Sequence, residues 1–178
     1  ASCPDLDEHL RALSDAERLD ADRARLERRV RSRSESLARQ FDRVLETLQD
    51  FGYVDGWELT GAGEMLAHLY HESDLLVVEC IRRGLLDGLD APGIAAMASM
   101  FTFERRGPAG TGPTVQFPTR AVRERWSEVE SAWQAIAGRE QELALPVTRG
   151  PDAGFCWPAH VWVAGGELTT VLHDAEIS

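Results

Sequence analysis

The sequence SDLLVVECIRRGLLDGLDAPGIAAMASMFTF (residues 73–103) decides the fold class, because it predicts two consecutive helices. In its first half the apolar residues recur every three or four positions, which is typical of a helix with one buried face. These residues are Leu75, Leu76, Val78, Ile81, Leu85 and Leu86. Ser73 is suited to cap this first helix. Asp90 and Pro92 mark the start of a second helix that is apolar on nearly all sides, so we expect it to lie centrally.

The preceding segment FGYVDGWELT (residues 51–60) predicts a short β-hairpin. Its Asp55-Gly56 pair is the two-residue turn that most strongly indicates a hairpin. Thr60 is suited to cap the next helix, GAGEMLAHLYHE (residues 61–72). Helix, hairpin and helix together resemble a fragment of a winged-helix domain, although such short strands do not form a sheet on their own.

Further toward the N-terminus, one long helix is predicted from Asp15 to Asp50. Its apolar residues form a narrow stripe, close to a coiled-coil seam: Leu19, Leu26, Val30, Leu37, Phe41, Val44 and Leu48. The arginine-rich first half predicts an arm that contacts a partner, and we expect core packing to begin with Phe41. We therefore divide the chain into an arm helix (residues 1–40) and a helical domain (residues 41–178).

The C-terminal half is also predicted to be helical. A loop rich in glycine and proline (residues 105–118) precedes a helix from Thr119 to Glu142. That helix carries a heptad seam of five residues: Val122, Trp126, Val129, Trp133 and Ile136. A second loop (residues 146–154) leads to short helices at residues 157–165 and 167–174. The predicted fold class is all-α, a multi-helix orthogonal domain with a winged-helix-like small hairpin and a long N-terminal arm helix.

Composition restricts the functional classes. The chain has 178 residues and a net charge of −11, whereas a free-standing nucleic-acid binder usually carries a basic surplus. No apolar run approaches the roughly 20 residues that a membrane helix needs, and we find no secretory leader. The three cysteines are far apart and form no C-x-x-C pair, which is typical of a reduced, cytoplasmic protein. From the lack of a long apolar run we expect no membrane partner.

The sequence contains no lysine, so it supplies no mechanism that needs one. GPAGTGPT (residues 107–114) fits a phosphate-binding loop, except that Pro113 replaces the lysine that contacts the β and γ phosphates. We expect a flexible surface loop here. The chain is therefore predicted to bind no cofactor by itself.

One helical pattern has the spacing of a metal site, with Glu64 and Glu72 beside His68 and His71. It matches no zinc-protease signature, and a hydrogen-bonded helix end is the simpler interpretation. No arrangement of serine, histidine and acid suggests a nucleophilic triad. We predict neither catalytic residues nor a metal site.

Residues 41–106 resemble a known family in several segments. These are FGYVD after a helix, WELTGAGEML, HESDLLVVECIRRGLLDGL and AAMASMFTFERR. In combination they resemble the C-terminal helical (DSHCT) domain of superkiller-like DExH RNA helicases, in its bacterial HelY-like form. Residues 1–40 resemble the stretch where these helicases return from a stalk-like insertion. FCWPAHVWVAGGELTTVLHDAEIS (residues 155–178) resembles the tail of the family, without its terminal helix.

The resemblance implies a non-catalytic module of an ATP-dependent RNA helicase, excised from a longer parent chain. ATP and magnesium would be used by the ATPase domains of that parent, which this sequence lacks. The module would pack on those domains and help guide single-stranded RNA along the helix Asp74–Leu86. By matching segments, the nucleic-acid-binding residues would be Glu72, Asp74, Glu79, Arg82 and Arg83.

Two other interpretations stay open at this point. The heptad seams would serve a protein-interaction or dimerisation module equally well. A stand-alone winged-helix regulator needs a basic recognition helix, and residues 61–72 contain no arginine. For the helix Asp74–Leu86, we expect Leu75, Val78 and Leu86 to face the core. Its polar residues Asp74, Glu79, Arg82 and Arg83 are expected to face away, because charged groups are costly to bury.

Overall fold

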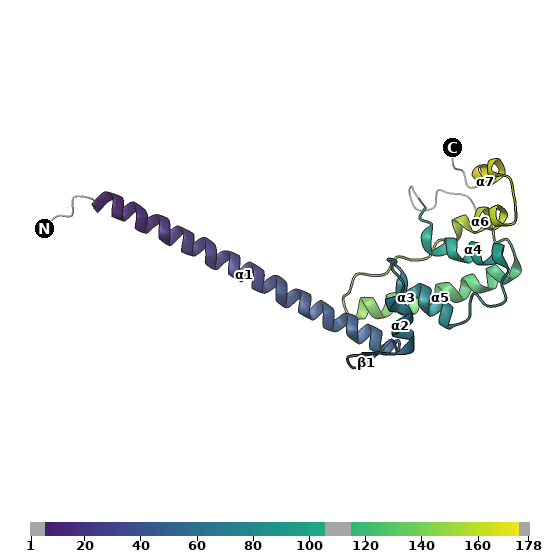
Figure 1. The fold of residues 1–178 in the computed structure, drawn as a ribbon, viewed down its shortest axis with the longest axis horizontal. Coiled ribbons are helices and arrows are strands. Elements are labelled where there is room, and N and C mark those ends of the chain that lie inside the picture. The colour runs from purple at the N-terminus through teal and green to yellow at the C-terminus, as the bar shows by residue number, and fades with distance from the viewer. Residues whose placement is uncertain (1–5, 106–114, 175–178) are drawn as a thin grey trace. The chain divides into compact units, whose positions relative to one another are not determined.

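The computed structural model describes residues 6–105 and 115–174, which are almost entirely helical (Figure 1). The elements in chain order are α1 (Leu6–Asp50), β1 (Val54–Asp55), β2 (Glu58–Leu59), α2 (Gly61–Ala67), α3 (Asp74–Arg82), α4 (Ala91–Thr102), α5 (Arg120–Glu142), a 3₁₀ turn (Ala153–Phe155), α6 (Cys156–Val163) and α7 (Leu168–Asp174). The all-α prediction is confirmed. The chain forms two compact units, Ala1–Glu46 and Thr47–Ser178. The predicted boundary after residue 40 stays a prediction.

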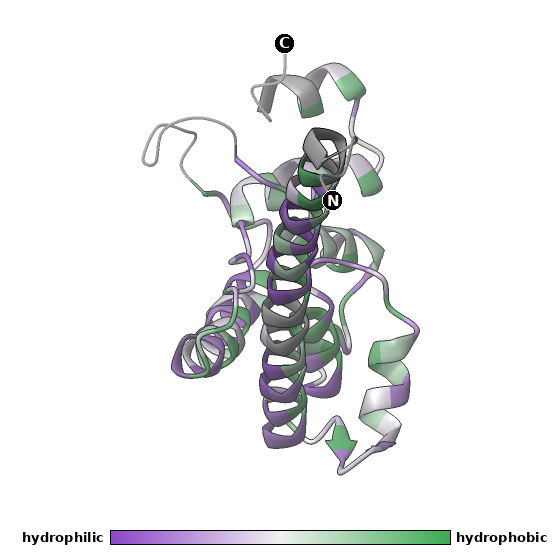
Figure 2. Ribbon diagram, turned by 90° about the vertical axis from the view of Figure 1, so that its left-hand side faces the viewer, coloured by the Kyte–Doolittle hydropathy of each residue, from purple (hydrophilic) through white to green (hydrophobic). Residues whose placement is uncertain are grey.

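Helix α1 begins at Leu6, nine residues before the predicted start at Asp15. Hydrophilic and hydrophobic residues alternate along its ribbon in Figure 2. Ion pairs one turn apart support the helix, such as Arg18 with Asp15 at 3.3 Å. The apolar stripe is largely exposed, with Leu19 at 65% and Leu37 at 66%. The expectation that core packing begins at Phe41 was wrong, because this side chain is 53% exposed.

Core packing begins at the C-terminal end of α1, where Thr47 is buried and Leu48 packs against the core. The hairpin follows as predicted, with Val54 opposite Leu59 and Asp55 opposite Glu58. The turn residues are thus Gly56 and Trp57, one position later than expected. Gly56 has a φ of 61°, which glycine adopts without a steric penalty.

Thr60 caps α2 as predicted, accepting a hydrogen bond from the Gly63 amide at 3.2 Å. The same hydroxyl donates to the Gly52 carbonyl oxygen at 2.8 Å, so one side chain connects the hairpin to the helix. Helix α2 ends at Ala67, five residues before the predicted end at Glu72.

Helices α3 and α4 form the predicted pair, but α3 is shorter than expected. It ends at Arg82, where Gly84 has a φ of 68°. The Leu85 amide donates to the Cys80 carbonyl and the Gly84 amide to the Ile81 carbonyl, the bonding pattern of a glycine-ended helix. In the described part of the chain, the Ser73 side chain makes no capping hydrogen bond, contrary to our expectation.

The core lies between α3, α4, α5 and α6. Its fully enclosed side chains include Tyr53, Leu76, Val78, Cys80, Met97, Met100, Val122, Val129, Ile136 and Cys156. Asp90 caps α4 by accepting from the Gly93 amide at 2.9 Å, and α4 packs against both α5 and α6, which confirms its predicted central place. Burial raises the pKa values of the Cys80 and Cys156 thiols to about 12, so both stay protonated and unreactive.

The seam of α5 is confirmed. Val122, Val129 and Ile136 are fully buried, and Trp126 and Trp133 pack against the core. Trp133 and Glu140 hold the loop after α5 through hydrogen bonds with Thr148. The Trp133 indole donates to the Thr148 carbonyl at 2.9 Å, and the buried Glu140 carboxylate accepts from the Thr148 amide at 2.6 Å.

The short helices α6 and α7 are found where the sequence predicts them. The candidate phosphate loop at residues 107–114 lies outside the described residues. Among the described helices, none is long and apolar enough to cross a membrane.

Candidate functional site

The five sequence-predicted site residues lie in two clusters at opposite ends of α3. Glu79, Arg82 and Arg83 gather at its C-terminal end, while Glu72 and Asp74 flank its N-terminal end. We call the first group the arginine cluster and the second the acidic cluster. The structure therefore does not join all five residues into a single site.

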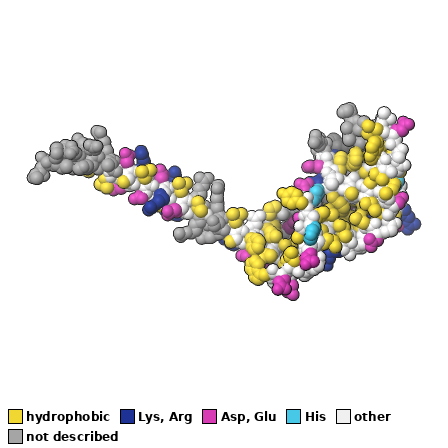
Figure 3. All heavy atoms as spheres, in the orientation of Figure 1, with side chains coloured by type: hydrophobic (Ala, Val, Ile, Leu, Met, Phe, Trp, Pro, Cys, Tyr) yellow, Lys and Arg dark blue, Asp and Glu magenta, His cyan; other side chains and the backbone are white. Residues whose placement is uncertain are grey.

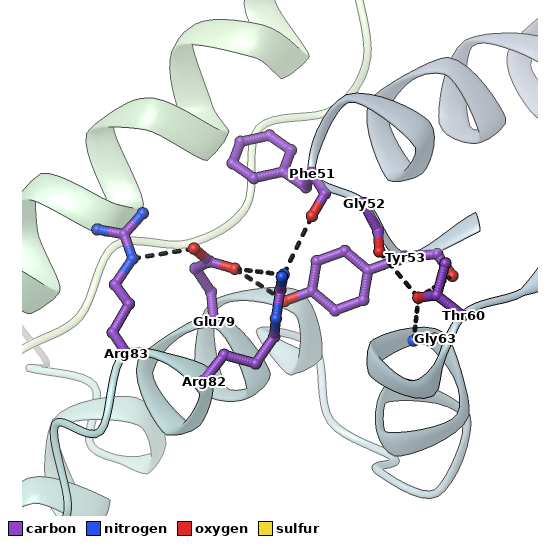
Figure 4. A network of polar contacts seen from close by, with 8 residues as sticks. All are labelled: Phe51, Gly52, Tyr53, Thr60, Gly63, Glu79, Arg82 and Arg83. Atoms are coloured by element: carbon purple, nitrogen blue, oxygen red, sulfur yellow. Dashed lines mark hydrogen bonds and ion pairs between the residues drawn. The ribbon is translucent and has the colours of Figure 1, made fainter. Parts of the chain in front are cut away.

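In the arginine cluster, the Glu79 carboxylate lies between two guanidinium groups (Figure 4). Its Oε2 accepts hydrogen bonds from the Tyr53 hydroxyl at 3.0 Å and from Arg82 Nη1 at 3.1 Å. Its Oε1 accepts from Arg83 Nε at 2.9 Å. With three donors, two of them charged, the carboxylate is almost fully paired.

The expectation that Glu79 faces away from the core was wrong, because the residue is only 9% exposed. Burial of a lone carboxylate would be prohibitive, but hydrogen bonds and opposite charges offset that cost. Leu75 and Val78 are buried and Leu86 is partly buried against the core, as predicted.

Arg82 joins α3 to the segment between α1 and β1 through its planar side chain. Besides Glu79, it donates to the Phe51 carbonyl oxygen at 3.0 Å, and its guanidinium lies 4.9 Å from the centre of the Tyr53 ring. The contact with the Tyr53 hydroxyl, together with the Glu79 charge, raises the pKa of Arg82. Both arginine side chains remain 36% exposed, so part of each side chain faces solvent.

Tyr53 is fully buried and contacts the arginine cluster from the core side. Burial raises the pKa of its phenol from 10.0 to about 12, although the Arg82 guanidinium opposes the shift. Below pH 10 the phenol is protonated in both the folded and unfolded states, so its contribution to stability is fully present. Between about pH 10 and 12 the unfolded chain ionises first, and that contribution is lost.

We therefore expect the free energy of unfolding to fall more steeply for the wild type than for Tyr53→Phe when the pH rises from about 9 to about 11. Urea titrations at both pH values measure this difference. Tyr70 is present in both proteins and so does not affect the comparison. An equal fall in the free energy of unfolding in the two proteins would contradict a raised pKa for Tyr53.

The acidic cluster is built differently. Glu72 accepts from Arg149 Nε at 2.8 Å, and Arg149 also donates to the carbonyl oxygens of Phe101 and Phe103 at 2.7 and 2.8 Å. Arg149 thus bridges Glu72 to the end of α4. The Asp74 carboxylate accepts from the Leu75 amide at 2.7 Å.

A shallow pocket next to α3 is lined by Tyr70, His71, Glu72 and Asp74. The Tyr70 ring is fully exposed. On the face turned to the viewer in Figure 3, histidine side chains lie beside acidic and hydrophobic ones. The four described residues that line the pocket include aromatic and acidic groups but no arginine, and the neighbouring Arg149 is already paired with Glu72.

The helical pattern with the spacing of a metal site is not assembled on one helix in the described residues. Helix α2 ends at Ala67, so His71 and Glu72 do not share a helical face with Glu64. The His68 ring contacts the Glu64 carbonyl, and His71 Nδ1 accepts from the Ser73 amide at 3.1 Å. Among the described residues, no three His, Cys, Asp or Glu side chains are grouped to hold a metal ion.

Sequence reasoning missed Tyr53, Tyr70 and Arg149. Tyr53 was assigned only to the hairpin, and no local signal pairs it with a residue 26 positions later. Arg149 lies in a loop 77 residues from Glu72. Tyr70 could have been found as an aromatic residue in a polar segment next to two predicted site residues.

Comparison with known proteins identifies the relatives of this chain. The DSHCT (NUC185) domain family matches residues 56–178. Over 99% of its length, the chain is 35% identical to a probable helicase HelY from Mycobacterium leprae (strain TN), of which it covers 20%. A probable helicase HelY from Mycobacterium tuberculosis (strain ATCC 25618 / H37Rv) is 33% identical over 98% of this chain, which covers 20% of that helicase.

The chain thus spans about a fifth of the length of these curated relatives. The family match includes the hairpin turn, the arginine cluster and all helices from α2 onward. The predicted resemblance is confirmed, and the chain belongs to the DSHCT domain family in its bacterial HelY-like form.

Proposed function

We propose that this chain is a non-catalytic C-terminal helical module of an ATP-dependent RNA helicase. The observation that carries the proposal is the similarity of nearly the whole chain to one fifth of proteins named probable helicases. The module would pack on the ATPase domains of the same parent chain and help guide single-stranded RNA. Those domains would bind ATP and magnesium, and the parent would act in the cytoplasm.

The arginine cluster supports a contact with the RNA backbone. Arg82 and Arg83 are adjacent, charged and partly exposed, and guanidinium groups suit phosphate oxygens. The net charge of −11 indicates that such contacts are few. Most of the phosphate charge would therefore be neutralised by the other domains of the parent.

The Arg82→Gln/Arg83→Gln double variant of the full-length parent is expected to bind single-stranded RNA more weakly. The slope of log affinity against log salt should flatten by up to about two units, because each lost phosphate contact removes about one released counterion. Fluorescence anisotropy with a labelled oligoribonucleotide at several salt concentrations measures both quantities.

Arg120→Gln/Arg123→Gln is the matched control, since it removes the same charge from exposed positions on α5. We expect its salt slope to stay close to that of the wild type. An unchanged affinity and slope in the Arg82/Arg83 variant, with thermal stability retained, would argue that these arginines serve only the internal ion pairs.

The exposed stripe of α1 supports a second candidate, a protein-interaction or dimerisation module. Leu19, Leu26, Val30 and Leu37 are each more than half exposed. Most of the stability of such a helix comes from packing its apolar stripe against a partner, so the stripe favours a partner helix or protein. Sedimentation of the chain with and without single-stranded RNA separates the candidates, because self-association that is independent of RNA would favour the second.

A further inference from the structure

The β-hairpin ends in an exposed segment that is both apolar and acidic. Trp57, Glu58 and Leu59 follow one another and are all exposed, with Trp57 at 82% and Leu59 at 55%. Isolated apolar side chains are ordinary on a protein surface, but aromatic side chains are enriched where proteins contact each other. We call residues 55–59 the hairpin tip.

Two like charges face each other across the hairpin tip. Asp55 lies directly opposite Glu58 in the strand register, and both side chains are exposed. Opposite side chains of paired strands lie on the same face and close together, so two carboxylates there repel each other and destabilise the pair. In the described part of the chain, neither carboxylate forms an ion pair that would offset this repulsion. A cationic group placed between them would relieve it.

The hairpin tip is anchored firmly from the core side. Tyr53 is fully buried and Val54 is 7% exposed. The Thr60 amide donates to the Tyr53 carbonyl oxygen at 3.0 Å, which ties the end of the hairpin to its start. Because alternate residues of a strand point to opposite faces and Val54 points to the core, Asp55 and Glu58 point to solvent. A partner would therefore find the tip already ordered, which lowers the entropy cost of binding.

We propose that the hairpin tip is a docking site for a segment of a partner protein that carries arginine or lysine beside aliphatic or aromatic side chains. The cations would lie between Asp55 and Glu58, and the apolar side chains would pack on Trp57 and Leu59. The same two carboxylates would repel phosphate groups, so a nucleic-acid strand or an anionic membrane does not fit this surface. The inference is independent of the strand contact proposed above.

Asp55→Asn/Glu58→Gln separates docking from a purely structural role. Both substitutions keep the shape of the side chain and remove its charge, and asparagine before Gly56 also suits the hairpin turn. Because the repulsion across the tip is lost, the Tm of the chain should rise by about 2 °C. Binding of a basic segment should weaken in the same variant. A structural role alone would not move stability and binding in opposite directions.

The probe is a short, fluorescently labelled synthetic peptide that alternates arginine with leucine. One companion peptide has serine in place of leucine, and another has glutamine in place of arginine. By fluorescence anisotropy, the alternating peptide should bind the chain about fivefold more tightly than either companion, because it uses both the charged and the apolar part of the tip. Asp55→Asn/Glu58→Gln should bind the alternating peptide about fivefold more weakly than the wild type.

Glu124→Gln/Glu128→Gln is the matched control, since it removes the same charge from exposed positions on α5. Its affinity for the alternating peptide should change less than about twofold, which is the effect of distant screened charges. Trp57→Ala tests the apolar part separately and should weaken binding about tenfold, provided that its Tm shows a folded chain. This variant also keeps the inference testable if the acidic pair cannot be replaced.

The full-length parent should bind the alternating peptide within about twofold of the affinity of the chain, which would support a partner protein as the occupant. Binding by the chain but not by the parent would overturn the inference, because the tip would then be covered by other domains of the parent. Self-association of the chain in sedimentation, lost in Asp55→Asn/Glu58→Gln, would assign the tip to a second copy instead. Equal affinity for all three peptides, or unchanged binding by the folded variants, would also overturn the inference.

Discussion

Replacing Gly63 with alanine is expected to destabilise the Thr47–Ser178 unit by about 3 kcal/mol. Gly63 lies in α2 directly beneath the hairpin, and a Cβ atom added there would overlap the Tyr53 carbonyl oxygen. That oxygen accepts hydrogen bonds from the Thr60 amide at 3.0 Å and from the Thr60 hydroxyl at 3.1 Å. The carbonyl cannot move away without breaking these bonds and displacing the buried Tyr53.

Gly61→Ala is the matched control, because it lies two residues earlier in the same helix and has open space around its Cα. Alanine should be neutral or stabilising there by up to about 1 kcal/mol, since glycine is a poor helix former. Urea unfolding followed by tryptophan fluorescence measures both, because all five tryptophans lie in this unit. Equal unfolding midpoints for the two variants would show that the hairpin yields to the added methyl group.

Helices were predictable where the signal is local. Thr60, Asp90 and Thr119 each accept a hydrogen bond from an amide three residues later, as their sequence context indicates. The heptad seam of α5 was equally readable, because apolar spacing reports directly on which face is buried. The end of α3 was missed because apolar residues continue beyond Gly84, whose positive φ ends the helix.

The arginine cluster could be predicted only in part. The family resemblance selected Glu79, Arg82 and Arg83, but the orientation of Glu79 depends on a partner elsewhere. Its hydrogen bond to Tyr53 spans 26 residues and exists only after α3 packs against the hairpin segment. The free-energy cost of burying a charge predicted an exposed Glu79 carboxylate. The Tyr53 hydroxyl that helps to offset this cost is distant in the sequence, so no local pattern indicates it.

The acidic cluster illustrates the same limit. Glu72 was selected for a contact with nucleic acid, yet its nearest partner is Arg149, which also binds the carbonyls at the end of α4. A carboxylate paired in this way has less freedom to accept bonds from a sugar or a base. Among the predicted residues, the arginine cluster is therefore the better supported place for a strand contact.

Ile136→Ala is expected to destabilise the Thr47–Ser178 unit by about 3 kcal/mol, because Ile136 is fully buried on the face of α5 and its truncation leaves a cavity. Helix α5 packs directly against α3, so this core residue belongs to the layer that holds the arginine cluster in place. In a thermal unfolding measurement, the loss corresponds to a fall in Tm of about 10 °C.

Ile94→Ala is the control, since it is the same substitution in a helix but at a side chain that is 42% exposed. It should cost less than about 1 kcal/mol, because little apolar area is lost and alanine favours the helix. If Ile136→Ala destabilised the unit no more than Ile94→Ala, the buried seam of α5 would not be the packed layer that supports α3. In that case a stable platform beneath α3 could not explain how Arg82 and Arg83 are held.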